Sequence, residues 1–432
     1  MSALASPAAR DFLPSRGLPL LYLATGLASL TAAFAVVAAD PAGVVGFFYH
    51  PRMLAVVHLV TLGWIGGSVL GSIHIVGPLA LRMPLRATRG DLAGFAAFVV
   101  GMLGMVSHFW LDTASGMAWS AGLASLAFVR ATLRLLPRLA RAPIPAAVKV
   151  PVGLAFANVV LAVALGVLLA VNKLAAFLPV SHLQAVLAHA HLAALGFGTL
   201  MVMGAGYRLL PMILPAGMTR GNGPLVSSVL VEAGVLGLAA SFFLDGRGRP
   251  VFALVAAAGV FVFLAHVVAM LRDPRPAPAE RPRLDLPRVQ ALVALGCLAL
   301  ATVLGLALVL APRLDASSPV GMAYGALALV GFLAQMIVAV QQRLLPLAAW
   351  LWAFAGAQYQ TMPGSLHEAS GRLLPALVFA GWVLGAPLLS AGLALEWLPC
   401  LRAGAALLFL GAVAHGAGLA RMFRRLRTSI PA

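Results

Sequence analysis

The chain has very little charge for its length. Only 9% of its 432 residues are charged, whereas 62% are hydrophobic, and the mean hydropathy is +1.00. So few charged groups cannot cover the surface of a water-soluble protein of this size, and no soluble domain fits in the remainder. The composition therefore predicts an all-α polytopic membrane protein in contact with the lipid bilayer.

Cysteine and acidic residues are also scarce. The two cysteines, Cys297 and Cys400, lie in separate apolar segments, which excludes a disulfide framework and a thiolate metal motif. No cleavable signal pattern precedes the first apolar run, so we expect that run to remain as a helix. Twelve acidic against 29 basic residues leave a net charge of +17.

Membrane topology explains this positive charge better than nucleic-acid binding does. With the N-terminus inside, twenty basic residues fall in cytoplasmic segments and six fall outside, which predicts cytoplasmic termini and a multi-pass protein of a bacterial inner membrane. Apolar runs long enough to span predict twelve helices. Their approximate limits are 18–39, 53–81, 91–110, 115–136, 150–172, 182–213, 224–243, 250–271, 288–311, 319–346, 373–393 and 397–420.

Three segments of the chain are versions of one another: residues 58–78, 191–211 and 326–346. The first two align at an offset of 133 residues and the third follows at 135. Three copies over twelve spans predict units of four helices in a pseudo-threefold bundle, with repeats at about 18–149, 150–287 and 288–432. The whole chain, 1–432, is then one integral-membrane domain.

The first two copies begin with a histidine inside an apolar helix. His58 and His191 stand at matched depth toward the outer side, which predicts two axial ligands of one haem facing each other. Nearby glycines, Gly63 and Gly196 among them, would let a flat macrocycle approach. The alternative is that these glycines only permit close helix packing.

A third histidine, His189, precedes His191 by two residues and so points to nearly the opposite face of its helix. It cannot bind the same iron as His191. It could instead bind a second haem or copper together with His182, which lies on the same helical face further out, or with His50. In the alternative, His182 and His50 are interfacial imidazoles that face water.

Several other polar side chains lie within predicted spans, where their burial in the hydrocarbon costs free energy. Glu232 could belong to a proton pathway with Arg208 and His74, or could simply pair with Arg208. His74 shares its repeat position with Tyr207 and Gln342, which favours a hydrogen bond between helices. His266 and His415 are expected at the cytoplasmic surface.

These residues resemble the catalytic subunits (subunit I) of haem-copper oxidases, most closely C-family bacterial cytochrome c oxidases and nitric oxide reductases. His58 matches the family's low-spin haem ligand, and the segment from His189 to Pro211 looks like its His-x-His helix. The resemblance implies a haem b protein in electron transfer or small-gas chemistry with nitric oxide or dioxygen. It also implies a separate electron donor, cytochrome c or quinol.

The sequence departs from that family in two places. The family's His-x-His helix is the tenth, where this chain has Tyr324 and Ala326, and no histidine stands in residues 224–243, where the family keeps its copper ligands. We therefore expect a divergent relative without a complete haem-copper centre. The alternative function is a cofactor-free transporter or channel that uses the same bundle and its polar pathway, or an assembly subunit.

Overall fold

The computed structural model describes residues 12–217, 221–244, 246–275, 285–311, 318–354 and 373–428. Three long helices contain a π-helical segment, written η. The helical elements in chain order are α2 (Gly17–Ala39), α3 (Pro41–Val44), α4 (Pro51–His58), η1 (Leu59–Gly66), α5 (Gly67–Leu79), α6 (Arg89–Trp110), α7 (Met117–Arg141), α8 (Ala146–Ala175), α9 (His182–His191), η2 (Leu192–Thr199), α10 (Leu200–Ile213), α11 (Gly223–Phe243), α12 (Arg249–Arg272), α13 (Leu286–Leu310), α14 (Pro319–Ala326), η3 (Leu327–Ala334), α15 (Gln335–Phe354), α16 (Leu373–Ala394) and α17 (Leu398–Thr428).

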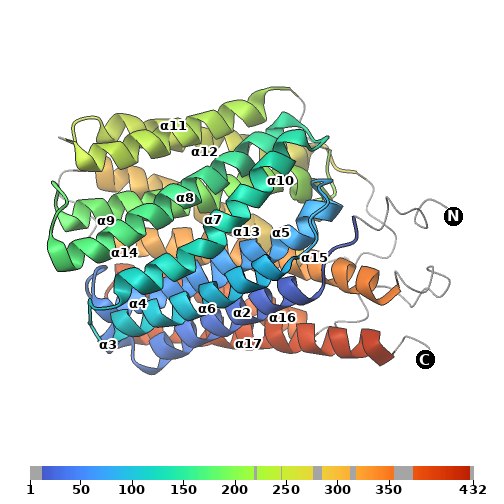
Figure 1. Ribbon diagram of the computed structural model, residues 1–432, viewed down its shortest axis with the longest axis horizontal. Helices are drawn as coiled ribbons and strands as arrows, with labels where there is room; N and C mark the ends of the chain where they lie inside the picture. The colour runs from blue at the N-terminus through green and yellow to red at the C-terminus, as the bar shows by residue number, and fades with distance from the viewer. Residues whose placement is uncertain are drawn as a thin grey trace.

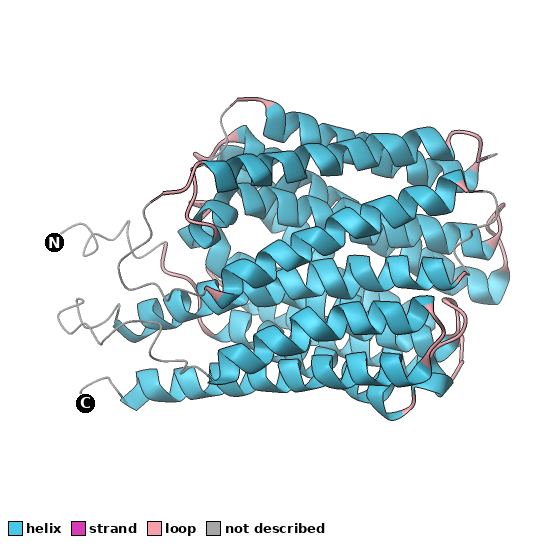
Figure 2. Ribbon diagram, turned by 180° about the vertical axis from the view of Figure 1, so that it is seen from behind, coloured by secondary structure: helices cyan, strands magenta, loops and turns pink. Residues whose placement is uncertain are grey.

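The helices form one elongated bundle in which they run side by side along the long axis (Figure 1). Among the described residues, the extended pairing is a single isolated bridge between Ala216 and Pro274, and Figure 2 shows helices and loops without strands. The start of α2 and the end of α17 lie at the same end of the bundle (Figure 1). The predicted all-α polytopic membrane fold is confirmed.

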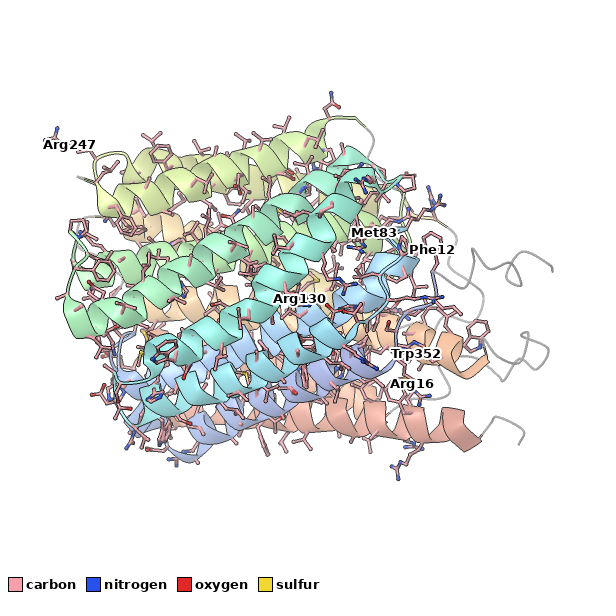
Figure 3. The ribbon with its side chains drawn as sticks, viewed as in Figure 1. Phe12, Arg16, Met83, Arg130, Arg247 and Trp352 are labelled. Atoms are coloured by element: carbon pink, nitrogen blue, oxygen red, sulfur yellow. The ribbon has the colours of Figure 1, made fainter. Side chains whose placement is uncertain are left out.

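Eleven helices in the described part of the chain are long and apolar enough to cross a membrane. The twelfth predicted span, 115–136, is also a helix, α7, but its second half carries Arg130, Arg134, Arg138 and Arg141. Two of these arginines bind Asp91 on α6, so this half of α7 is held by polar contacts. In Figure 3 Arg16 and Arg247 lie at opposite ends of the bundle, as their predicted sides require.

Each repeated segment contains a π-helix at the same place. The segments η1, η2 and η3 are eight residues long each and begin directly after His58, His191 and Ala326. Their starts are separated by 133 and 135 residues, the offsets of the sequence repeat. π-Helices are rare and occur frequently at functional sites. The limits of the four-helix units themselves stay a prediction.

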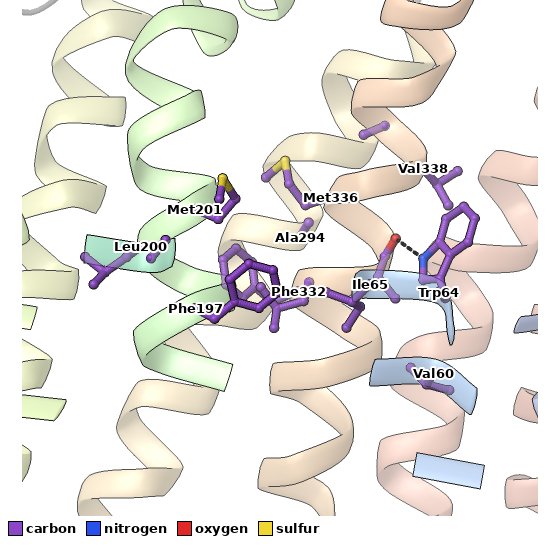
Figure 4. Close-up of a cluster of buried hydrophobic side chains, with 14 of the residues drawn as sticks. Val60, Trp64, Ile65, Phe197, Leu200, Met201, Ala294, Phe332, Met336 and Val338 are labelled. Carbon is purple, nitrogen blue, oxygen red and sulfur yellow. Dashed lines mark hydrogen bonds between the residues drawn. The ribbon is translucent and has the colours of Figure 1, made fainter. Parts of the chain in front are cut away.

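The three π-helical segments meet in the middle of the bundle, where η3 contacts both η1 and η2. The seventh position of each repeated segment is aromatic and buried: Trp64, Phe197 and Phe332 are 0%, 5% and 1% exposed. Figure 4 shows this cluster, in which the indole N–H of Trp64 donates to the carbonyl of Ala334 at 3.3 Å. These side chains form the tightly packed centre below the site described next.

Candidate cofactor site

A cavity of about 870 Å³ lies among the helices above this aromatic centre. It occupies the end of the bundle that carries α3, α4, α9 and α14, opposite α5, α10 and α15 (Figure 1). Its walls are mostly aliphatic and aromatic, and Phe197 and Phe332 border it from below. This volume lies within the range of about 300–1,000 Å³ that is usual for small-molecule and cofactor sites.

Three imidazoles that line the cavity are held in the same way. Nδ1 of His58 lies 2.7 Å from the carbonyl oxygen of Leu54, and Nδ1 of His191 lies 2.7 Å from that of Leu187. A carbonyl oxygen can only accept, so the proton of each ring is on Nδ1. His189 is fixed likewise, but by another helix, since its Nδ1 lies 2.8 Å from the carbonyl of Ala162 on α8.

This arrangement leaves the lone pair of Nε2 available on all three rings. Metal-ligating histidines usually donate their other ring N–H to a carbonyl or carboxylate, which fixes the tautomer and the ring orientation. The donor chemistry and the apolar walls therefore fit a haem. In the described part of the chain, no cluster of three or more His, Cys, Asp or Glu side chains could hold a bare metal ion.

The repeat determines which side chains face each other. Nε2 of His191 lies 3.5 Å from the hydroxyl of Tyr324, and the planes of the two rings are nearly parallel, with 26° between them. Tyr324 precedes Ala326, the counterpart of His191, by two residues. His191 is the first residue of its repeated segment. It thus faces Tyr324, which lies two positions before the start of the next segment. We call the part of the cavity at His191 and Tyr324 sector 2.

The same relation pairs His58 with His189, which define sector 1. Both imidazoles line the cavity, as does His191. The sequence-based expectation that His58 and His191 face one another stays a prediction.

Aromatic rings lie beside both histidines that begin a repeated segment. Phe109 lies 4.8 Å from His58, centroid to centroid, and Phe242 lies 5.6 Å from His191. The two phenylalanines are themselves separated by 133 residues. In the third part of the cavity, sector 3, the equivalent pair is Ala326 and Val56, both in the cavity wall, and it offers no ligand.

His182 lies at the rim of sector 1, and both of its ring nitrogens are engaged. The amide of Asn172 is oriented by the backbone N–H of Leu178, which donates to Oδ1, so its Nδ2 donates to Nδ1 of His182 at 3.0 Å. Nε2–H of His182 then donates to the hydroxyl of Tyr49. The metal role of His182 stays a prediction, and its ring is held by hydrogen bonds from both sides. His50 is exposed and lies outside the cavity lining.

Tyr49 closes the rim from the loop between α3 and α4. The ammonium of Lys173 lies 5.4 Å from the centre of its ring and 5.8 Å from that of Phe109. Burial, reinforced by the negative charge of Asp112, raises the pKa of Tyr49 to about 12. The phenol is therefore neutral at physiological pH and serves as a hydrogen-bonding partner of His182.

The predicted pair of Glu232 and Arg208 is wrong. The carboxylate of Glu232 on α11 accepts from Nδ2 of Asn158 on α8 at 2.6 Å, whereas Nε of Arg208 donates to the carbonyl of Ala80 at 3.3 Å. Asn158 is fully buried, and the sequence analysis missed it because its partner lies on another helix. An asparagine inside an apolar run was the available signal.

Two of the three copies of the His74 repeat position make polar contacts between helices. The hydroxyl of Tyr207 bonds with Ser227 and His266, each at 2.9 Å, and Gln342 donates to Gln290 at 2.8 Å. His74 itself lies with Asp91, Arg130 and Arg134 around a small pocket, and its Nδ1 has no hydrogen-bond partner in the described residues. Glu232, Arg208 and His74 thus lie in separate contacts.

One of the two histidines expected at the cytoplasmic surface is instead held inside the bundle. His415 is 4% exposed and its Nε2–H donates to Oε1 of Gln341 at 3.0 Å. Its predicted surface position is wrong, because a polar partner on a neighbouring helix removes the need for this side chain to reach water. His266 is partly exposed and is bonded to Tyr207.

The glycines near the histidines pack helices together. A Cβ atom at Gly63 would lie 2.5 Å from Cβ of Ser29, and one at Gly196 would lie 2.6 Å from Cγ of Asn158. The space beside these glycines is filled by protein, which supports the packing alternative and not access for a macrocycle. Gly166 on α8 is different, since a Cβ there would meet the ring of His189 at 3.0 Å.

Comparison of the sequence with known protein families finds no match, and comparison with curated proteins finds no significant similarity.

Proposed function

We propose that the chain is a membrane electron-transfer protein that holds a b-type haem in sector 1, between His58 and His189. The observation that carries the proposal is the matched hydrogen bonding of these two rings. Each has Nδ1 bonded to a backbone carbonyl and presents Nε2 to a mostly apolar cavity of about 870 Å³. Bis-histidine ligation of a haem needs this donor set.

A haem in this position would exchange single electrons at its iron. His58 and His189 would hold it from α4 and α9, and Phe109 would fix the ring of His58 by stacking at 4.8 Å. Lys173 lies at the rim beside Tyr49. Its positive charge would pair with a carboxylate of the haem that reaches the surface. A haem held by both His58 and His189 would have no ligand position left for a gas, so sector 1 favours electron transfer over gas binding.

The proposal includes the finer predictions from the sequence. A divergent member of the haem-copper oxidase subunit I superfamily is supported by the His-x-His segment on the sixth span and by the threefold placement of the π-helices. The basic residues support cytoplasmic termini in a bacterial inner membrane, which would put the cavity on the outer side. A cofactor-free transporter is less well supported, because Glu232, Arg208 and His74 lie in separate contacts among the described residues.

Spectroscopy of single-histidine variants tests the proposal. The chain is expressed with ample haem, purified in detergent, and examined by reduced-minus-oxidised spectra and by haem extraction. We expect a low-spin b-type spectrum that is lost in His58→Ala and His189→Ala. The exposed His50→Ala is the matched control, and His191→Ala should keep the low-spin spectrum. A wild-type protein without haem, or a spectrum lost only in His191→Ala, would overturn the assignment.

A further inference from the structure

A small pocket lies beside His74, where the second copy of the repeat has a direct contact. In that copy the hydroxyl of Tyr207 bonds with Ser227 at 2.9 Å. At the repeat offset of 133 residues, His74 and Gly94 take the places of Tyr207 and Ser227. The smaller imidazole and the missing hydroxymethyl group leave a space, and both residues line the resulting pocket of about 30 Å³.

The wall of this pocket carries an excess of positive charge. Asp91 on α6 accepts from Nε of Arg130 at 3.0 Å and from the guanidinium of Arg134, both on α7. It also accepts from the backbone N–H and the hydroxyl of Thr88 at 2.8 and 2.7 Å. These four donors use the lone pairs of the carboxylate, which offers about four sites. Two guanidiniums therefore share one saturated carboxylate.

The other polar groups of the wall can donate. The hydroxyl of Tyr22 on α2 and Nδ1 of His74 have no hydrogen-bond partner among the described residues, and a neutral imidazole can carry its proton on Nδ1. Arg130 bonds to Asp91 and Thr88 through Nε and Nη2, which leaves Nη1. Donors around one uncompensated positive charge favour an anion, because charges withdrawn from water are stable only when paired.

The pocket is enclosed and small. The side chains of Asp91 and Arg134 are 8% and 18% exposed, and Tyr22 and His74 are 4% and 7% exposed. Arg130, at 38%, marks the accessible side. One buried water needs about 10–15 Å³, so the pocket holds about two waters or one ion of halide size. A phosphate or sulfate ion is too large for it.

We propose that this pocket binds a small monovalent anion of halide size, such as chloride. The anion accepts from Tyr22, His74 and Arg130, and it thereby joins α2, α5 and α7 where the second copy of the repeat uses a direct bond between two hydroxyls. The pocket shares no lining residue with the cofactor cavity. Binding of the anion goes beyond the function proposed for sector 1 and does not depend on it.

Chloride NMR of the purified full chain in a neutral detergent tests this proposal, because bound chloride broadens the resonance and a titration with sodium chloride gives the affinity. Gly94→Ser places the side chain of Ser227 in the pocket. Its Cβ would lie 3.5 Å from Cδ of Arg130 and 3.8 Å from Cα of Ala127, which are ordinary contacts, so the variant should fold. We expect Gly94→Ser and Tyr22→Phe each to bind chloride at least roughly tenfold more weakly, since Tyr22→Phe loses one hydrogen bond to a charged group.

Two matched variants and two competing anions complete the experiment. Gly122→Ser makes the same change where nothing lies within 4 Å of the added Cβ, and Tyr49→Phe removes a phenol from the rim of sector 1; both should bind like the wild type. Bromide should displace chloride, whereas gluconate is too large to enter. A wild type without saturable broadening would mean that the pocket holds water only and would overturn the proposal. Wild-type affinity in Gly94→Ser and Tyr22→Phe, or displacement by gluconate as readily as by bromide, would overturn it as well.

Discussion

Gly166→Val tests the role of His189 without removing the histidine. Gly166 lies on α8, four residues after Ala162, whose carbonyl holds Nδ1 of His189 at 2.8 Å. A Cβ atom at position 166 would already lie 3.0 Å from Cε1 and 3.4 Å from Nδ1 of the ring. The branched side chain of valine reaches about 1.5 Å further than Cβ. The imidazole must therefore turn away from α8.

The size of the effect follows from this geometry. A displacement of about 1 Å stretches the bond to Ala162 beyond the range of a hydrogen bond, which costs about 0.5–1.5 kcal/mol of stability. Loss of a partner that orients a metal ligand lowers metal affinity roughly tenfold to hundredfold. We expect the haem affinity of Gly166→Val to fall by a similar factor, equivalent to about 1.4–2.7 kcal/mol.

Haem titration of the purified protein, followed through the Soret band, measures this affinity. Gly122→Val is the matched control, because it makes the same change within a long helix where nothing lies within 4 Å of the added Cβ. Both variants gain the same helix propensity, so only the contact with His189 differs. Wild-type affinity in Gly166→Val, or an equal loss in Gly122→Val, would refute the reasoning.

Three further predictions concern stability, measured by thermal unfolding in detergent. Asp91→Asn should lower the unfolding free energy by about 2 kcal/mol, because Asp91 binds two arginines, whereas Asp40→Asn, with one exposed partner at 3.7 Å, should change it by less than about 0.5 kcal/mol. Trp64→Ala should lower it by about 3–5 kcal/mol through a cavity at the bundle centre, and Trp119→Ala, whose side chain is 82% exposed, serves as the control. Because the pKa of Tyr49 is raised from 10.0 to about 12, its contribution to stability is complete below pH 10 and is lost as the pH rises toward 12; Tyr49→Phe should remove that dependence, and a wild-type curve that is flat over this range would contradict it.

The repeat and its histidines could be recognised in the sequence, but the pairing of the histidines could not. Matched depth suggested that His58 faces His191, whereas in the structure His191 lies against Tyr324 and His58 shares the cavity with His189. Tyr324 stands two residues before the third copy in the sequence. Its role required the angular relation between neighbouring units, which depends on how η1, η2 and η3 meet and which no local pattern encodes.

Polar contacts between helices show the same limit. Arg208 and Glu232 are the obvious opposite charges in neighbouring spans, yet Asn158 binds Glu232 and a backbone carbonyl takes Arg208. His415 was expected at the surface because it stands near a basic segment, but Gln341 holds it inside. Each of these contacts depends on which helix faces are adjacent, and the apolar helices of the bundle offer many faces of similar hydrophobicity.

The sequence by itself determined the membrane environment, the helical architecture and the three repeated segments of this protein. Those properties follow from local quantities: the transfer of apolar segments into lipid, the need of a backbone in hydrocarbon to bond internally, and the similarity of three segments. Only the tertiary structure decided that the cavity has one sector with two imidazoles, one with an imidazole and a phenol, and one without a ligand. The reason is physical, since the direction of a side chain depends on the rotation of its helix, and packing against the next unit fixes that rotation.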